Sequence, residues 1–310
     1  MPSYERPLIS IVIPTRNRWN LLRQLLRSIC LSSNINLKKA AEVIIIDDSS
    51  TIDMPIDILK FRDKFYRFII FRSQRRLGAS TARNIGLLIS QGRYILFVDD
   101  DAILPPHFIN SFINLLNNNN DIAMAGGIIR YLKNPSKIQY VAWRVNLSSR
   151  AFIFGNITYE SVTSLDNLGL LDADYIPTAF LVRREIAMKI RGFDTNIPLY
   201  YDDADFGYRI KKIGLKIIIN PQISVYHNSD LAIFFNPIKT YMYIRNSTIF
   251  MIKHSKLHKI TIAFGICVLS IRCFFQILKY SKELKFHTII LNFLYIMRGL
   301  VESVIITFIT

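Results

Sequence analysis

The stretch Tyr94-Ile-Leu-Phe-Val-Asp-Asp-Asp101 decides the fold, because five apolar residues are followed directly by three carboxylates. A short, continuous apolar run indicates a strand that is buried on both faces, which is typical of a parallel sheet. Two more such runs, Leu8–Ile13 and Glu42–Ile46, come earlier in the chain, and Arg67–Phe71 supplies a fourth short strand. The first hundred residues therefore predict four strands of one sheet.

Helical patterns separate these strands. Between the first two, apolar residues recur at helical spacing, at Leu21, Leu22, Leu25, Leu26 and Ile29. A second helix is expected over Ala79–Ser90, with Gly92 ending it before the next strand. A chain that alternates strands and helices in this way predicts an open α/β sheet flanked by helices.

Polar residues follow each strand at the point where it ends. The first strand runs into Pro14-Thr15-Arg16-Asn17, the second into Asp47-Asp48, and the third into Asp99-Asp100-Asp101. Ligands of open α/β sheets bind at the carboxyl ends of the strands, so these side chains are expected to share one site. Three adjacent carboxylates repel one another, and a hard divalent cation such as Mg²⁺ would compensate them while binding a diphosphate.

Two further motifs carry charge. The segment Arg75–Gly86 places Arg76 and Arg83 near a helix start, where phosphate is favoured. A second acidic cluster, Tyr201-Asp-Asp-Ala-Asp-Phe206, follows a helical stretch at Arg183–Ile190. Taken alone, each motif could also be an ordinary solvated surface.

The overall charge is strongly basic, with 39 Lys and Arg against 23 Asp and Glu in 310 residues, a formal net charge of +16. This length is typical of about two structural units. The three cysteines form no CxxC pair, which argues against a disulfide framework or a zinc site and fits a reducing cytosol.

The last 80 residues, Leu231–Thr310, differ from the rest, with ten Lys or Arg and two acids. Their apolar runs, Ile260–Ile271 and Phe286–Thr310, are bounded or interrupted by charged residues, so neither predicts a clean membrane span of about 20 residues. Helices that lie in the interface of an anionic membrane suit the pattern better. A packed helical extension or a surface for a second subunit is the alternative, and we expect a division into residues 1–230 and 231–310.

Together, the motifs resemble the inverting family 2 glycosyltransferases, which have the GT-A fold, a Rossmann-like mixed sheet flanked by helices. The resemblance covers roughly Pro7–His227. It rests on Ser10–Asn17, Ile46–Ser50, Gly78–Gly86, Phe97–Asp101, Gly192–Asp194, Tyr201–Phe206 with Arg209, and Val225–His227. In addition, Tyr243–Asn246 is similar to a stretch that follows the catalytic domain in bacterial rhamnosyl- and other polysaccharide transferases.

The resemblance implies a metal-dependent transferase that uses Mn²⁺ or Mg²⁺ and a UDP- or dTDP-sugar. Its donor site would be formed by Pro14, Thr15, Arg16, Asn17, Asp47, Asp48, Arg76, Arg83, Asp99 and Asp100. Asp101 would be the main metal ligand, with Asp99 and His227 as further ligands, and Asp203 would be the catalytic base. The family more often has Glu-Asp where this chain has Asp202-Asp203, which leaves open which of the two is the base.

The resemblance further implies work at the cytoplasmic face of the cell membrane on a saccharide or lipid-linked saccharide, in surface polysaccharide synthesis, with a homo-oligomer as one option. A sugar-phosphate nucleotidyltransferase is the alternative enzyme, but the chain lacks the Gly-rich N-terminal loop with a basic tail expected there. A non-enzymatic protein that binds membranes or polyanions would also use the +16 charge. Aspartates at strand ends repel phosphate without a metal, which argues against nucleic acid as a partner.

Overall fold

The computed structural model describes residues 6–31, 35–141, 143–145, 147–148, 157–159, 168–228, 236–279, 284 and 286–309. The strands are β1 (Ile9–Thr15), β2 (Ala41–Asp47), β3 (Arg67–Arg72), β4 (Tyr94–Val98), β5 (Ala102–Ile103), β6 (Ile122–Tyr131), β7 (Asn134–Tyr140), β8 (Trp143–Val145), β9 (Ile157–Tyr159), β10 (Leu171–Asp172), β11 (Ala179–Arg183) and β12 (Lys216–His227).

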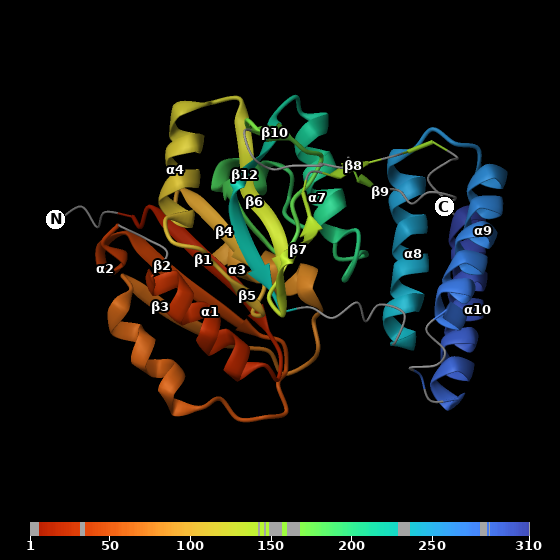
Figure 1. The fold of residues 1–310 in the computed structure, drawn as a ribbon, viewed down its shortest axis with the longest axis horizontal. Helices are drawn as coiled ribbons and strands as arrows, with labels where there is room; N and C mark the ends of the chain where they lie inside the picture. Colours follow the sequence, from red (N-terminus) through yellow and green to blue (C-terminus); the bar gives the residue numbers. More distant parts are fainter. Residues whose placement is uncertain are drawn as a thin grey trace.

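Helices flank the sheet and continue beyond it (Figure 1). They are α1 (Trp19–Leu31), α2 (Leu37–Ala40), the 3₁₀ helix η1 (Ile56–Lys64), α3 (Ala79–Ile89), α4 (Phe108–Asn118), α6 (Arg184–Lys189), α7 (Asp202–Lys212), α8 (Pro237–His254), α9 (Lys259–Lys279) and α10 (Phe286–Ile309). The four strands and two helices expected in the first hundred residues are all present, within one or two residues at most ends.

Ten of the strands form one mixed sheet, whose main order is β10-β12-β6-β11-β4-β1-β2-β3. The four strands predicted from the sequence lie together as a parallel half, in which Thr15 of β1 is opposite Asp47 of β2. Strand β11 then runs antiparallel to both β4 and β6. As a result, the polar ends of β1, β2 and β4 meet at one edge of the sheet.

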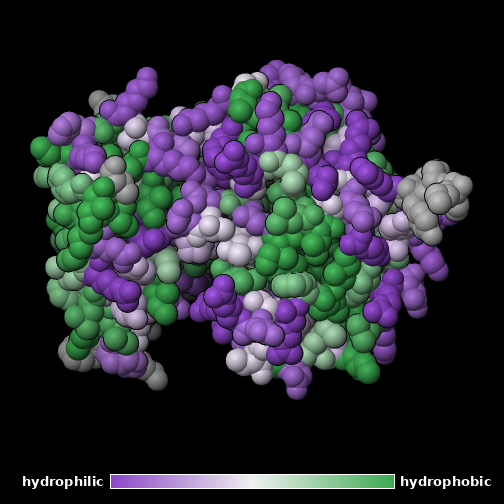
Figure 2. Space-filling model, turned by 180° about the vertical axis from the view of Figure 1, so that it is seen from behind, coloured by the Kyte–Doolittle hydropathy of each residue, from purple (hydrophilic) through white to green (hydrophobic). Residues whose placement is uncertain are grey.

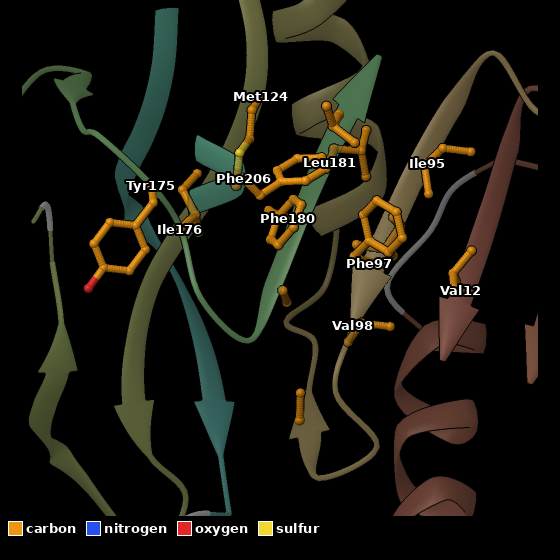
Figure 3. Close-up of a cluster of buried hydrophobic side chains, with 14 of the residues drawn as sticks. Val12, Ile95, Phe97, Val98, Met124, Tyr175, Ile176, Phe180, Leu181 and Phe206 are labelled. Atoms are coloured by element: carbon orange, nitrogen blue, oxygen red, sulfur yellow. The ribbon is translucent and has the colours of Figure 1, made fainter. Parts of the chain in front are cut away.

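Aromatic packing joins β4 to the second acidic motif. The ring of Phe97 in β4 lies 5.5 Å from that of Phe180 in β11 and 6.0 Å from that of Phe206 in α7 (Figure 3). A third ring, Phe193, lies 5.1 Å from Phe97 and is stacked on Phe206 at 4.4 Å. This buried cluster fixes α7 relative to the strand that carries the three aspartates.

Helix α3 lies directly on β1 because residue 86 is glycine. A Cβ atom at Gly86 would lie 2.2 Å from Cγ1 of Val12, far inside contact distance. The close approach also fixes the distance from the sheet of Arg83, which is one turn earlier in the same helix.

The C-terminal helices α8, α9 and α10 stand together beside the sheet (Figure 1). By length and composition, Lys259–Lys279 and His287–Ile309 could each cross a membrane, with mean hydropathies of 2.0 and 1.8. Our expectation that charges interrupt any such span is therefore wrong, because Arg272, Arg298 and Glu302 are too few to lower the mean. Since a core helix of a soluble protein can reach the same values, the surroundings of these helices must decide their role.

Candidate active site

The loop that follows β1 is tightly anchored. Thr15 is buried, and its hydroxyl donates a 2.7 Å hydrogen bond to Asp100. Asn17 has a left-handed backbone (φ 57°), and its side-chain oxygen accepts the backbone N–H of Thr51 at 2.8 Å. The Nε of Arg16 is buried and has no hydrogen-bond partner among the described residues. The guanidinium of Arg16 in this loop can therefore still donate a hydrogen bond to a ligand.

The residues after β2 organise the neighbouring loops. Asp48 accepts hydrogen bonds from the backbone N–H groups of Leu77 and, at 3.1 Å, Gly78. Asp47 is buried and accepts the backbone N–H of Ser50 at 2.9 Å. Asp47 thus holds the loop after β2, and Asp48 holds the loop that comes just before α3.

Two more of the expected donor-site residues lie at this edge, and they differ in exposure. Pro14 is half-buried within β1, one residue before Thr15. Arg76 is exposed in the loop before α3.

The three aspartates after β4 have different environments. Asp100 is 4% exposed, and burial raises its pKa to about 6, although Thr15 and Arg18 stabilise the carboxylate. Arg18 contacts Asp100 at 3.1 Å and Asp101 at 2.8 Å. Asp99 is more open and pairs with Arg83 at 2.7 Å.

Asp99, Asp101 and His227 can supply one ligand atom each within 4.8 Å of one another. Nε2 of His227 is 3.1 Å from Oδ1 of Asp101, and its Nδ1 is 3.0 Å from the side-chain oxygen of Gln139. Burial opposes charge on both members of this pair, but the pKa of Asp101 is lowered and that of His227 is raised, mainly by their mutual interaction. Apart from this contact with His227, Oδ1 of Asp101 is buried without a hydrogen-bond partner in the described part of the chain, so this donor set fits a divalent cation.

Arg83 connects this cluster to the second acidic motif. It is 5% exposed, and its guanidinium lies 2.7 Å from Asp99, 2.6 Å from Asp202 and 5.2 Å from the ring centre of Phe193. Burial opposes the charge, but Asp99, Asp203 and Asp202 outweigh it and raise the pKa of Arg83. We expected Arg83 at the donor phosphates; in this structure its two terminal nitrogens are bound by the carboxylates of Asp99 and Asp202.

The two aspartates that begin α7 are not equivalent. Oδ2 of Asp202 is bound by Arg83, whereas Oδ1 of Asp203 is buried, 3.8 Å from Arg83, and without a hydrogen-bond partner within the described ranges. Burial, followed by the charge of Asp202, raises the pKa of Asp203 well above its ordinary value. Tyr200 and Tyr201 just before them have left-handed backbones (φ 58° and 62°), which set the angle at which the helix enters the site.

Two site residues were missed in the sequence. Arg18 directly follows the Pro14–Asn17 stretch, and this position was the signal that could have identified it. Thr178 has no such signal, because it acts through its backbone: its carbonyl accepts the N–H of Asp99 at 2.8 Å. Its φ of 66° is rare for a β-branched residue and marks local strain beside the aspartates.

This mixed sheet, with acidic residues gathered at one edge, has the architecture of the GT-A glycosyltransferases. The model of the family described as Glycosyl transferase family 2 matches residues 10–191, and the chain belongs to this family. Our prediction of a GT-A glycosyltransferase of family 2 is thereby confirmed.

Individual relatives are distant. An uncharacterized glycosyltransferase of Haemophilus influenzae is 23% identical over 71% of this chain and 65% of its own length. The mannosyltransferase PcManGT from Pyrobaculum calidifontis, solved with GDP-Man and Mn²⁺, has a TM-score of 0.59 at 13% identity, covering 96% of this chain and 87% of that one. TarS of Staphylococcus aureus, solved with UDP-GlcNAc, has a TM-score of 0.57 at 15% identity, covering 96% and 81%.

These two structures share the fold with this chain. The chain spans less than two thirds of the length of the first curated relatives that it matches.

Proposed function

We propose that this protein is a metal-dependent, inverting glycosyltransferase of hexosyl or rhamnosyl type. It transfers a sugar from a UDP- or dTDP-sugar to a saccharide or lipid-linked saccharide in surface polysaccharide synthesis, at the cytoplasmic face of the membrane. Residues 1–230 are the proposed catalytic domain and residues 231–310 an extension. The observation that carries this proposal is the pair of acidic clusters held together by Arg83, because sugar transfer needs a cation site and a base side by side.

The proposed cation site consists of Asp99, Asp101 and His227, which would hold Mn²⁺ or Mg²⁺. Such a cation, when bound, neutralises charge on the departing diphosphate. Gln139 orients His227 through Nδ1, and this leaves Nε2 directed toward Asp101. The Mn²⁺ and GDP-Man bound by the Pyrobaculum neighbour support this proposal.

The proposed donor site lies along the ends of β1 and β2. Asp47 and Asp48 shape the wall for the nucleoside, and Pro14, Thr15 and Asn17 form the adjoining loop. Arg16 offers a buried N–H without a partner in the described structure, and exposed Arg76 adds positive charge; both suit a diphosphate.

Asp203 is the proposed base. Its unpartnered Oδ1 takes the proton of the acceptor hydroxyl while that oxygen bonds to the anomeric carbon and the bond from this carbon to the diphosphate breaks. Attack on the face opposite the leaving group inverts the configuration. The raised pKa of Asp203 makes it a stronger base than an ordinary carboxylate, whereas Asp202 is already bound by Arg83.

The proposal is tested by thermal stabilisation of the protein by UDP, dTDP and GDP, each with and without Mn²⁺ or Mg²⁺. A ligand that binds only the folded state raises the melting temperature. We expect a metal-dependent shift that disappears in Asp101→Ala and persists in Asp121→Ala, an exposed carboxylate paired with Lys216 away from the site. No shift with any nucleotide in the folded wild type would overturn the proposed donor site.

A further inference from the structure

Two charged residues of α10, Arg298 and Glu302, contact side chains of helix α8. Nε of Arg245 in α8 lies 2.9 Å from Oε1 of Glu302, and the hydroxyl of Tyr241 donates to the same carboxylate. The guanidinium of Arg298 lies over the ring of Tyr241, 4.9 Å from its centre. Both charged side chains of α10 therefore point toward α8.

The outer faces of α9 and α10 are correspondingly apolar. Large side chains that are 42–71% exposed form one stripe on α9, at Ile260, Phe264, Ile271, Phe275 and Leu278. A second stripe, 49–54% exposed, lies on α10 at Leu294, Val301, Ile305 and Phe308. Figure 2 shows apolar residues along the edge of the bundle that faces away from the sheet. Arg298 is also exposed, at the helical spacing of the α10 stripe, but the rest of this face is apolar. An exposed apolar face of this extent marks an interaction surface.

Helix α8 separates this face from the sheet and is fastened to the sheet side along its length. Arg245 donates to the carbonyl of Asn196 at 2.9 Å, and Lys253 pairs with Asp194 at 2.7 Å. Figure 1 shows the resulting order of layers, with α8 between the sheet and the pair α9 and α10. If α9 and α10 crossed a bilayer in this arrangement, α8 and the polar surface bound to it would be drawn into hydrocarbon.

We propose that the outer face of α9 and α10 lies in the plane of an anionic membrane, as an anchor that enters one leaflet without crossing the bilayer. The basic residues support this orientation. Lys256 and Lys259 are exposed at one end of α9, and Lys279 is exposed at the other, so both ends can reach lipid phosphates at the same depth. A second copy packed antiparallel on this face would instead bring Lys259 near Lys279, and like charges would oppose that pairing.

The anchor places the proposed site close to lipid. The ring of Tyr201, which precedes α7, lies 5.5 Å from that of Tyr243 in α8. The first turn of α7, which carries Asp203, is therefore separated from the proposed membrane face by the layer of α8. This arrangement supports the lipid-linked form of the acceptor, a point that rests on the proposed function. The anchor itself does not depend on that function.

The first experiment is flotation of the full chain with vesicles of phosphatidylcholine alone or mixed with phosphatidylglycerol. We expect binding to the anionic vesicles and at least a tenfold weaker partition for Phe264→Glu/Phe275→Glu. The matched control is Ile56→Glu/Leu88→Glu, which changes two side chains of 80% and 66% exposure on the sheet domain. Equal loss in the control, or none in the face variant, would overturn the assignment of this face.

The second experiment separates lying in the membrane from crossing it. Lys256→Cys and Lys279→Cys are made in a background with Cys30, Cys267 and Cys273 replaced by serine that still floats with vesicles. Protein added to preformed vesicles is treated with a membrane-impermeant maleimide. Reaction at both positions supports the in-plane anchor, whereas protection of Lys279→Cys alone would show a spanning helix and overturn it.

Nucleotide stabilisation of the same variants separates the two proposals. A wild type that floats but shows no nucleotide shift defeats the glycosyltransferase proposal and leaves the anchor standing. A wild type that shows the shift but does not float defeats the anchor alone. If that protein is also a dimer that Phe264→Glu/Phe275→Glu converts to a monomer, the face is a contact between copies rather than with lipid.

Discussion

Nη1 of Arg83 and Oδ2 of Asp202 lie 2.6 Å apart, which ties α3 to the first residue of α7. The other terminal nitrogen of Arg83 binds Asp99 at 2.7 Å. One planar guanidinium thus sets the spacing between the cluster that would hold a cation and the carboxylates that would supply a base. These contacts are those expected of a positioning residue, and the contact of Arg83 with donor phosphate that the resemblance implies stays a prediction.

Arg83→Lys should lower both stability and turnover. Lysine keeps the charge but lacks the fork that reaches two carboxylates, so at least one charge-assisted hydrogen bond is lost. We expect a loss of about 1.5–3 kcal/mol in the free energy of unfolding, the contribution of a hydrogen bond to a charged group. Urea unfolding measures this loss, and kcat should fall more than donor affinity.

Arg62→Lys is the matched control, because Arg62 is exposed in η1. It should change stability by less than about 0.5 kcal/mol. If Arg83→Lys instead weakened donor binding while leaving stability unchanged, Arg83 would be a phosphate ligand after all.

Asp203→Asn should nearly abolish turnover while leaving nucleotide binding intact. Loss of a general base typically lowers the rate by about 10² to 10⁴-fold. Asp202→Asn should differ, since it removes the partner of buried Arg83 and is expected to destabilise the protein. Single-turnover rates with a saturating donor compare the two. A larger rate loss in a folded Asp202→Asn than in Asp203→Asn would assign the base to Asp202.

The parallel half of the sheet and its acidic edge could be predicted from sequence because each depends on local pattern. The short, bounded apolar run at Tyr94–Val98 favours a buried strand, which the structure confirms, and the aspartates that follow a strand lie at its carboxyl end. The role of Arg83 could not be predicted in this way. A sequence shows that an arginine follows a glycine-containing turn, but only the contacts in the structure show that its side chain joins Asp99 to Asp202.

The same limit applies to contacts between distant segments. His254 and Asp205 are separated by 49 residues and by the change of composition that suggested a boundary near residue 230. Nothing local marks either residue as half of a buried pair. The orientation of α9 and α10 was likewise hidden, since hydropathy does not record that Arg298 and Glu302 turn toward α8.

Gln139→Leu should weaken Mn²⁺ binding about tenfold or more, because the groups that orient a metal-binding histidine typically contribute 10- to 100-fold to affinity. The side-chain oxygen of Gln139 accepts a hydrogen bond from Nδ1–H of His227, 3.0 Å away. Calorimetric titration with Mn²⁺ measures the change. Gln91→Leu, on the exposed side of the turn after α3, is the control and should bind like wild type. Equal affinity in Gln139→Leu would remove His227 from the proposed ligand set.

The final prediction concerns pH and the buried contact between α8 and α7. Nε2 of His254 lies 2.8 Å from Asp205, which also pairs with Arg209 and Lys253, while Lys212 lies 3.2 Å from Nδ1. Burial, aided by Lys212 and Lys253, lowers the pKa of His254 below its ordinary 6.5 despite Asp205.

Just below pH 6.5 the unfolded chain then binds more protons at this histidine than the folded one does, so the contribution of His254 to the free energy of unfolding falls as pH drops from 7.5 to 5. Asp100, Asp203 and His227 have raised pKa values and contribute in the opposite direction, so the comparison with a His254 variant isolates this contribution. The lowered pKa of Asp205 affects the free energy of unfolding in a separate pH range, below the ordinary carboxylate pKa of 3.8. In urea unfolding, the change from pH 7.5 to 5 should be less destabilising in His254→Gln than in wild type. His258→Gln, exposed in the loop before α9, should match wild type. The same change with pH in His254→Gln as in wild type would show that His254 is not the group that titrates.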